Sequence, residues 1–190
     1  MDTKNVLFVG VGGQGTILAS RILTMGLVEH GYDVKMSEIH GMSQRGGNVS
    51  TQVRFGDKVY SPIIGEGGAD VLVSFETMEA ARNLNYLKKG GTLVVNTLEI
   101  PSMPILSGQV AYPQGIIPLL EAKMHTIAID ATKTAEALGN GKSANVVLLG
   151  ALVRSLQLEN IDWKSIIAKL VKPQFLDVNI KAFEAGWNMA

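Results

Sequence analysis

The chain has 190 residues, no cysteine, and 17 basic against 17 acidic side chains. Without thiolates it offers no disulfide, no cysteine nucleophile and no ligands for an iron–sulfur cluster of its own. The balanced charge argues against nucleic acid and against a polybasic membrane contact, and the N-terminus lacks the pattern of a secretory signal, so a cytoplasmic protein is expected. Because no low-complexity linker interrupts the chain, residues 1–190 are expected to form a single domain.

The N-terminal part predicts a strand, a helix and a second strand. Residues 6–9 are continuously apolar, as in a central parallel strand covered on both faces. Leu18, Ile22 and Met25 recur at helical spacing, which predicts a helix over 13–30. Residues 33–38 are typical of a strand, so a right-handed βαβ unit is expected.

A β-hairpin is expected next in the chain. Residues 49–55 alternate apolar with polar side chains, which indicates a strand with one solvent-facing side. The dipeptide Gly56-Asp57 fits a two-residue turn into a second strand at 59–64, where Pro62 suits a sheet edge.

The remaining chain returns to alternating strands and helices. Strands are predicted at 70–75, 92–96 and 126–129, and helices at 78–87, 144–156, 162–170 and 175–188. The predicted fold class is α/β: a Rossmann-like open, mostly parallel sheet with helices on both faces, an inserted β-hairpin and a helical C-terminus.

A glycine-rich turn between the first strand and the first helix is the main candidate site. Glycine lets backbone N–H groups approach an anion closely, and a helix N-terminus favours negative charge. The candidate phosphate-binding residues are Gly10, Gly12, Gly13, Gln14 and Gly15. The alternatives are tight strand–helix packing without a ligand, or a nicotinamide dinucleotide whose ribose would be held by Glu38.

A second polar loop follows the second strand. It has no periodicity and places a cation and an amide near the carboxyl ends of the strands, where ligands of open α/β sheets bind. Its candidate cofactor-binding residues are Ser43, Gln44, Arg45, Gly46 and Gly47. Arg45 is a candidate assisting residue, since a guanidinium pairs with carboxylates and phosphates in a bidentate manner. A surface loop without a ligand is the alternative.

Other chemistries are disfavoured. The three histidines, His30, His40 and His125, show no metal-ligand spacing, so no metal site is expected. Asp57 is followed by Lys58 without a downstream asparagine pair, so the metal-diphosphate motif of thiamine enzymes is absent.

Three motifs together carry a family resemblance. They are the turn at 10–15, the segment at 38–47 and the tripeptide Ser74-Phe75-Glu76. With them, residues 4 to about 155 resemble the gamma-type subunits of 2-oxoacid:ferredoxin oxidoreductases, among them the small (beta) subunits of the indolepyruvate enzymes.

The resemblance implies a hetero-oligomeric enzyme that converts an aryl 2-oxoacid and coenzyme A into acyl-CoA, carbon dioxide and reduced ferredoxin. It implies a large (alpha) partner subunit that carries thiamine diphosphate, Mg²⁺ and [4Fe–4S] clusters, and ferredoxin as a partner of the complex. This chain would bind none of these cofactors alone, would be inactive alone, and would shape coenzyme A access. The alternatives are an NAD(P)-binding Rossmann protein or small dehydrogenase, and a purely structural assembly subunit.

Overall fold

The computed structural model describes residues 2–40 and 46–190, and in these ranges six strands form one sheet. The strands are β1 (Lys4–Val11), β2 (Asp33–His40), β3 (Asn48–Gly56), β4 (Ala69–Ser74), β5 (Leu87–Asn96) and β6 (His125–Ile129). The helices are α1 (Thr16–Glu29), α2 (Thr77–Arg82), α3 (Met103–Leu106), α4 (Ile116–Lys123), α5 (Ala131–Ala137), α6 (Ala144–Ser155), α7 (Trp163–Leu170) and α8 (Leu176–Asn188), and short 3₁₀ turns lie at Leu84–Tyr86, Gly141–Ser143 and Pro173–Phe175.

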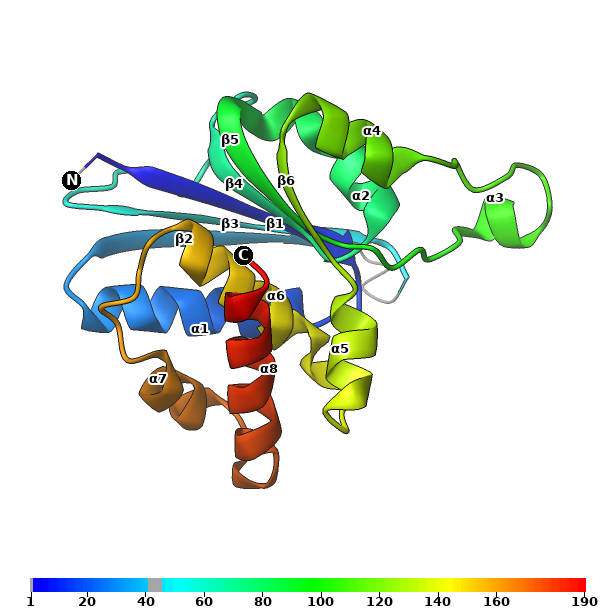
Figure 1. Cartoon of the computed structure of the whole chain (residues 1–190). Coiled ribbons are helices and arrows are strands. Elements are labelled where there is room, and N and C mark those ends of the chain that lie inside the picture. The colour runs from blue at the N-terminus through cyan, green and yellow to red at the C-terminus, as the bar shows by residue number, and fades with distance from the viewer. Residues whose placement is uncertain (1, 41–45) are drawn as a thin grey trace.

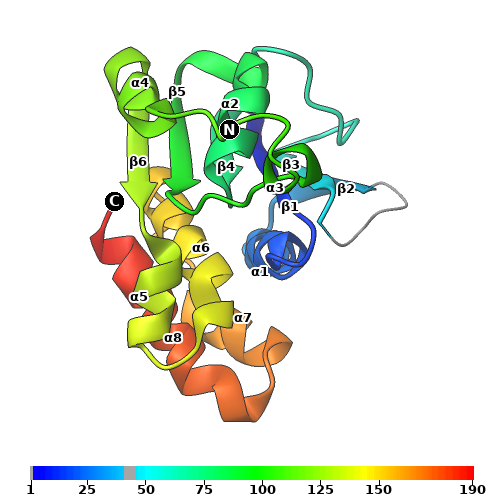
Figure 2. The same cartoon turned by 90° about the vertical axis from the view of Figure 1, so that its right-hand side faces the viewer.

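The sheet is mixed, in the order β2-β3-β1-β4-β5-β6. Strand β3 runs antiparallel to both of its neighbours, whereas β1, β4, β5 and β6 pair in parallel. Figure 1 shows α1 and α5 to α8 below the sheet and α2 and α4 above it, and Figure 2 shows the same layers after a quarter turn. The predicted fold class, an open α/β sheet with helices on both faces, is confirmed.

The two faces of the sheet carry separate apolar cores. Val6 and Phe8 of β1 point into the core beneath α1, α6 and α8, whereas Leu7 and Val9 point into the core beneath α2 and α4. Side chains alternate along a strand, so a continuous apolar run is the pattern of a strand buried on both faces. The interpretation of residues 6–9 is therefore confirmed.

The predicted second hairpin strand at 59–64 is wrong, because this segment forms no strand. Both hydrogen-bonding edges of β3 are already used, by β1 on one side and β2 on the other. The segment instead lies over the polar face of β3: Arg54 Nη1 donates to the Ser61 carbonyl at 2.9 Å, and Gln52 Oε1 accepts from the Ile64 amide at 2.5 Å. The polar residues of β3 thus hold a covering segment rather than face solvent.

The antiparallel partners of β3 also correct the βαβ prediction. Strands β1 and β2 are joined by α1 as expected, but β3 lies between them and the two strands do not pair directly. The inserted antiparallel element is therefore formed by β2 with β3, and not by β3 with the segment at 59–64.

Several predicted helix boundaries shift for local reasons. Helix α1 begins at Thr16 rather than at 13, because Gly13 and Gly15 adopt left-handed φ values of 105° and 81°. The helix predicted at 78–87 ends at Arg82, and β5 begins at Leu87 rather than at 92. The three C-terminal helices begin and end within a residue of their predicted bounds.

Helices α6 and α8 cross at very short range. A Cβ atom added to Gly186 would lie 1.7 Å from the Val147 carbonyl oxygen, and one added to Gly150 would lie 2.1 Å from the Phe183 carbonyl oxygen. The two backbones are therefore in direct contact. Among residues 2–40 and 46–190, no helix has the length and apolar character needed to cross a bilayer.

Candidate functional site

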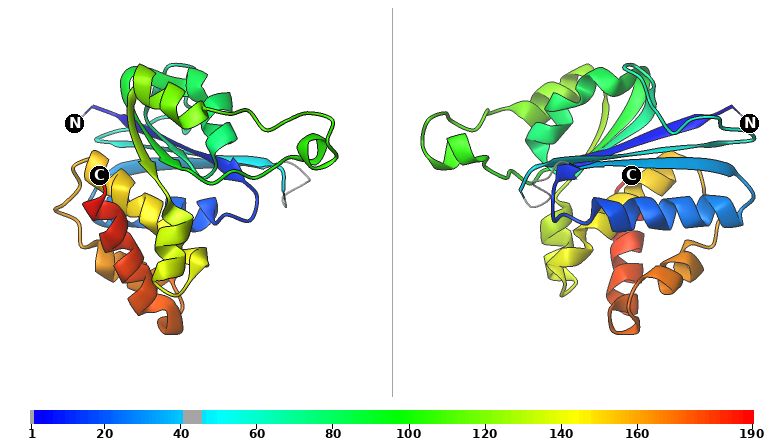
Figure 3. Two further views of the ribbon diagram at one scale, coloured as in Figure 1. Left: turned by 45° about the vertical axis from the view of Figure 1, so that its right-hand side comes forward. Right: turned by 180° about the vertical axis from the view of Figure 1, so that it is seen from behind.

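The glycine turn lies where the helices change sides of the sheet. Helix α1 follows β1 onto one face and α2 follows the neighbouring β4 onto the other (Figure 3). In open α/β sheets this reversal of connection direction opens a crevice at the carboxyl ends of the two strands, and ligands bind there. The turn at 10–15 therefore lies at the topological switch point of the sheet.

Gln14 fastens the turn to the end of β4. Its Oε1 accepts a hydrogen bond from the Val11 amide at 2.7 Å, and its Nε2 donates to the Phe75 carbonyl at 2.7 Å. A Cβ atom added to Gly10 would lie 2.8 Å from Gln14 Oε1 and 2.9 Å from Phe75 Cβ. The absence of a side chain at Gly10 thus makes room for the Gln14 amide, whose two ends both have protein partners.

The two predicted loops meet at this edge. The Gly12 amide donates to the Gly47 carbonyl at 2.8 Å, and the Gly46 amide donates to the Gly12 carbonyl at 3.3 Å. The structure therefore brings Gly46 and Gly47 against the turn. Ser43, Gln44 and Arg45 lie outside the described residues.

Hydrogen-bond donors remain available at the start of α1. Among the described residues, no acceptor faces the backbone N–H groups of Gly13, Gly15, Thr16 or Ile17. Helix α1 has 14 residues, so its dipole places roughly half a positive charge at this end. Within the described part of the chain, the turn therefore has the unpaired donors and the positive potential that an anion requires.

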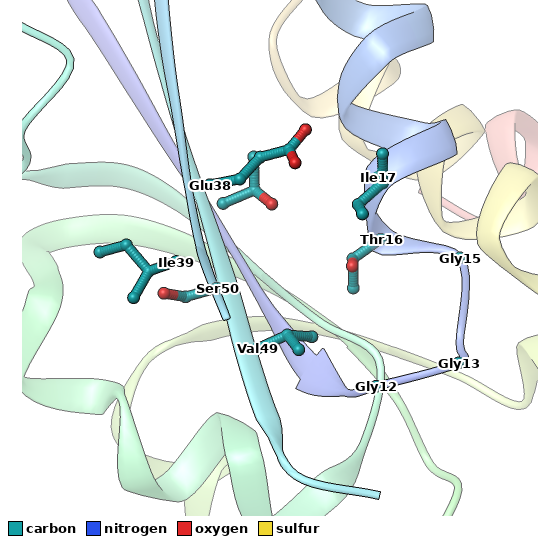
Figure 4. A pocket seen from close by; sticks show the side chains of 10 residues that line it. Gly12, Gly13, Gly15, Thr16, Ile17, Glu38, Ile39, Val49 and Ser50 are labelled. Carbon is teal, nitrogen blue, oxygen red and sulfur yellow. The ribbon is translucent and has the colours of Figure 1, made fainter. Parts of the chain in front are cut away.

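A cavity of about 380 Å³ lies on one side of the turn, between α1 and the strands β2 and β3 (Figure 4). It is lined by Gly12, Gly13, Gly15, Thr16, Ile17, Glu38, Ile39, Val49, Ser50 and Thr51. In Figure 4 the carboxylate of Glu38 extends from β2 towards α1. A carboxylate at this position repels phosphate but can accept hydrogen bonds from hydroxyl groups.

A second cavity, of about 480 Å³, lies on the other side of the turn at the switch point. Its lining residues are Gly13, Gln14, Gly15, Phe75, Asn96, Leu98, Thr132, Gly141, Lys142, Ala144 and Leu148. Among the described residues of this lining, Lys142 is the one with a charged side chain. As far as the described residues go, an anion is therefore favoured in this cavity over the first, which Glu38 borders.

Lys142, Asn96 and Thr132 were not predicted as site residues. The sequence signal at Lys142 is weak: a lysine between Asn140-Gly141 and the start of an apolar helix. Asn96 Nδ2 donates to Thr132 Oγ1 at 3.1 Å and to the Phe75 carbonyl at 3.2 Å. Asn96 ends β5, Thr132 lies in α5 just after β6, and Lys142 lies in the 3₁₀ turn before α6, so only the folded chain brings them together.

The start of α6 approaches the turn from the side of the second cavity. Asn145 Nδ2 donates to the Gly15 carbonyl at 3.1 Å, and a Cβ atom on Gly15 would lie 2.5 Å from that nitrogen. Ser143 occupies the N-cap position, but its hydroxyl makes no capping hydrogen bond. Within the described chain, Ser143 Oγ and Asn145 Oδ1 are buried without a hydrogen-bond partner.

The tripeptide Ser74-Phe75-Glu76 lies at the end of β4, beside the turn. Ser74 Oγ donates to the Glu76 carbonyl at 2.6 Å, and the Phe75 carbonyl receives Gln14. Glu76 is almost fully buried, and its carboxylate accepts hydrogen bonds from the Glu79 amide, the Ile100 amide and the Tyr112 hydroxyl. This tripeptide links the turn to the chain that follows β5.

These features define an open α/β domain whose glycine turn, helix N-terminus and lysine surround one cavity at the switch point. The family described as pyruvate ferredoxin/flavodoxin oxidoreductase matches residues 5–189, and the chain therefore belongs to this family. It is a small subunit of the 2-oxoacid ferredoxin oxidoreductase type, a class of multi-subunit enzymes with larger catalytic partners.

Three comparisons support this assignment. The chain is 42% identical over 194 residues to indolepyruvate oxidoreductase subunit IorB of Pyrococcus horikoshii, covering 98% of this chain and 95% of the relative. The gamma subunit of keto/oxoacid ferredoxin oxidoreductase from Geobacter sulfurreducens superposes with a TM-score of 0.72 at 25% identity, covering 98% of both chains. The ketoisovalerate oxidoreductase subunit VorA of Methanothermobacter marburgensis is 25% identical over 191 residues, but these cover 97% of this chain and only 36% of VorA.

Proposed function

We propose that this chain is the small subunit of an aryl-2-oxoacid:ferredoxin oxidoreductase of the indolepyruvate type. The observation that carries the proposal is the 42% identity to a subunit of that name over nearly the whole of both chains. In the proposed reaction the 2-oxoacid loses its carboxylate as carbon dioxide and its acyl carbon forms a thioester with coenzyme A. The two electrons released pass singly to ferredoxin, and the thiol proton is released.

The residues of this chain do not fit the redox cofactors of such an enzyme. There is no cysteine to ligate a [4Fe–4S] cluster, and among the described residues no group of three or more acidic or histidine side chains is placed to hold a metal ion. We therefore assign the clusters, thiamine diphosphate and Mg²⁺ to the larger subunit. On this proposal the small subunit is inactive alone.

The role proposed for this chain is to bind an anionic group of coenzyme A or of the oxoacid at the switch-point edge. Gly13 and Gly15, whose N–H groups have no acceptor among the described residues, border one cavity with the start of α6 and Lys142, which supports this role. Arg45, which follows the strand β2, is proposed to add a guanidinium to the same anion. Gln14 and Gly10 hold the shape of the turn.

Reconstitution tests the function. The chain is co-purified anaerobically with its large subunit, and indolepyruvate- and coenzyme A-dependent reduction of an electron acceptor is measured. Activity that requires both chains supports the proposal. Failure to form a stable complex, or full activity of the large subunit alone, rejects it.

Substitution of the two cations tests the anion site within the reconstituted enzyme. Arg45→Ala and Lys142→Ala should each raise the Michaelis constant for coenzyme A or for the oxoacid, by about tenfold if each removes one charge-assisted contact of about 1.5 kcal/mol. Lys89→Ala is the matched control, because Lys89 is an exposed lysine near the start of β5, at the opposite end of the strand from the cavity. Unchanged constants in both variants would remove the anion site from the proposal.

A second candidate, a dinucleotide-binding protein, is favoured by one observation: Glu38 borders the same cavity as the turn. However, β3 separates β2 from β1, so Glu38 lies two strands from the turn rather than on the neighbouring strand. Energy transfer from Trp163 or Trp187 to added NADH measures dinucleotide binding directly. A coenzyme A titration of the reconstituted complex separates the ligand-binding role from a purely structural one.

A further inference from the structure

The chain between β5 and α4 forms an arm that projects from the body of the protein. The arm comprises residues 100–115, carries α3 near its tip, and extends beyond the carboxyl edge of the sheet in Figures 1 and 3. Between Glu99 and Glu121 no residue is charged, although 18% of the whole chain is. Such an uncharged surface segment is unusual, because exposed loops normally carry polar and charged side chains.

The root of the arm is fixed by one buried carboxylate. Glu76 is 1% exposed, and its Oε1 accepts from the Ile100 amide at 3.1 Å and from the Tyr112 hydroxyl at 2.5 Å. The Tyr112 hydroxyl in turn accepts from the Met78 amide at 3.1 Å. Burial, and the hydrogen bond to Glu76, raise the pKa of Tyr112, so its phenol remains a donor across the physiological range. The two ends of the arm therefore meet at a single anchor.

The tip of the arm is apolar and exposed. Met103 is 74% exposed, Leu106 67% and Val110 55%. The tip keeps its shape through its own backbone, since the Leu106 amide donates to the Ser102 carbonyl and the Val110 amide to the Pro104 carbonyl. Fixing each of these residues in one conformation costs roughly 1–2 kcal/mol in entropy. Because their side chains are largely exposed, burial within this chain offsets little of that cost.

The composition of the arm matches the centre of a lasting protein interface. Such centres are depleted in charge and enriched in methionine and aromatic residues, and obligate interfaces are more apolar than transient ones. A transient partner such as ferredoxin would be expected to use charged groups, which the arm lacks.

The position of the arm indicates which partner covers it. The Leu98 carbonyl, at the root, accepts from the Thr77 amide at 2.9 Å, and Leu98 itself lines the switch-point cavity with Lys142. A subunit seated on the arm therefore lies beside that cavity. In VorA, this chain corresponds to 36% of a longer polypeptide, so a homologous domain exists covalently joined to further chain.

We infer that the arm is the docking element for the larger catalytic subunit, with Met103, Leu106 and Val110 inserted into an apolar groove of that subunit. The inference rests on the proposed function, because it requires that a large subunit exists. Glu76 and Tyr112 are positioning residues, since they act by holding the root of the arm. A second copy of this chain is the competing occupant.

The test compares the binding of full-length variants to the large subunit. Met103→Glu and Leu106→Glu place a charge at the tip, and each should weaken the complex by at least about 30-fold, the effect expected of an interface hot spot. Tyr60→Glu is the control, because Tyr60 is 88% exposed and belongs to the segment that covers β3. Circular dichroism and thermal unfolding of each isolated variant should match the wild type, since the side chains of Met103 and Leu106 are mostly exposed.

A third variant tests the anchor without altering the tip. Tyr112→Phe removes the hydroxyl bond to Glu76, and proteolysis within the arm of the isolated chain should become faster, while binding weakens less than in the tip variants. Unchanged proteolysis would remove the anchoring role.

The outcomes separate the two proposals. If the wild-type chain forms no complex, the proposed function and the docking inference both fail. If the wild type binds and the tip variants bind within twofold of it, or if Tyr60→Glu weakens binding equally, the docking inference alone is overturned. Self-association of the isolated chain that the tip variants abolish would assign the arm to a second copy and also overturn it.

Discussion

Replacing Gln14 by alanine should destabilise the glycine turn, because the Gln14 side chain is its main internal fastening. The change removes the acceptor of the Val11 amide and the donor to the Phe75 carbonyl, both at 2.7 Å. The Phe75 carbonyl keeps a partner, since Asn96 Nδ2 still donates to it at 3.2 Å. The loss therefore falls mainly on the Val11 amide.

The magnitude follows from these bonds. An unsatisfied, partly buried N–H group costs about 1–3 kcal/mol, and the second bond adds about 0.5–1 kcal/mol. We expect Gln14→Ala to lower the free energy of unfolding by about 2 kcal/mol, which for a chain of this size lowers Tm by about 4–8 °C. Urea unfolding followed by tryptophan fluorescence measures the change, and amide exchange at Val11 should accelerate. Gln109→Ala, at an exposed glutamine of the arm, is the control and should stay within about 0.5 kcal/mol of the wild type.

A double-mutant cycle with Gly10→Ala isolates the contact. The added Cβ lies 2.8 Å from Gln14 Oε1 and 2.9 Å from Phe75 Cβ, so Gly10→Ala should displace the Gln14 amide. In the Gln14→Ala background the first of these clashes is gone, and the double variant should lose less stability than the sum of the single variants. If Gln14→Ala is as stable as the control, or if the two changes are additive, the reasoning about the turn is refuted.

Two further changes test the packing and the electrostatics of the fold. Gly186→Ala should destabilise the chain by about 1–3 kcal/mol in urea unfolding, because the added Cβ would lie 1.7 Å from the Val147 carbonyl oxygen. The cost of this overpacking exceeds the gain of about 1 kcal/mol in helix propensity. A variant more stable than the wild type would contradict the close crossing of α6 and α8. Two hydrogen bonds, the larger contribution from Lys35 and the smaller from the Val59 amide, lower the pKa of Asp33 from 3.8 to about 2. Because this pKa is lowered in the folded state, its contribution to stability is present above the unfolded pKa and is lost as the pH falls through the folded one. Asp33→Asn should therefore lower the urea midpoint at pH 7, and the gap between the midpoints of the variant and the wild type should narrow between about pH 4 and pH 2. A gap that does not change with pH would contradict the pairing of Asp33 with Lys35.

The sequence predicts those parts of the fold whose signal is local. The apolar run in β1 indicates a buried strand because each residue faces a core on one side or the other, and the C-terminal helices follow from periodicity. The partners of β3 could not be predicted in this way. Alternation over 49–55 indicates a strand, but which strands lie beside it is decided by tertiary packing, and the Gly56-Asp57 dipeptide favoured a turn that the occupied edges of β3 do not permit.

The candidate site also contains residues that the sequence reveals and residues that only the structure reveals. Glycines at 10–15 are visible in the sequence because a left-handed φ and close approach leave few alternatives to glycine. Lys142 is not visible, since a single lysine in a neutral chain has no pattern and reaches the turn only through the placement of α6. The structure was also needed to separate the roles of two glycines: Gly10 makes room for the Gln14 side chain, and the Gly13 N–H has no acceptor in the described ranges 2–40 and 46–190.

The end of β4 joins the two parts of the molecule that carry the proposals. The Phe75 carbonyl receives Gln14 and thereby holds the glycine turn, while the adjacent Glu76 carboxylate receives the root of the arm. Because these two acceptors belong to adjacent residues, a change that moves the backbone at either one should alter both the glycine turn and the root of the arm. Any coupling between docking and anion binding through these residues is reciprocal. A variant of Phe75 or Glu76 should therefore affect both measurements, whereas Lys142→Ala, which changes neither residue, should leave arm docking unchanged.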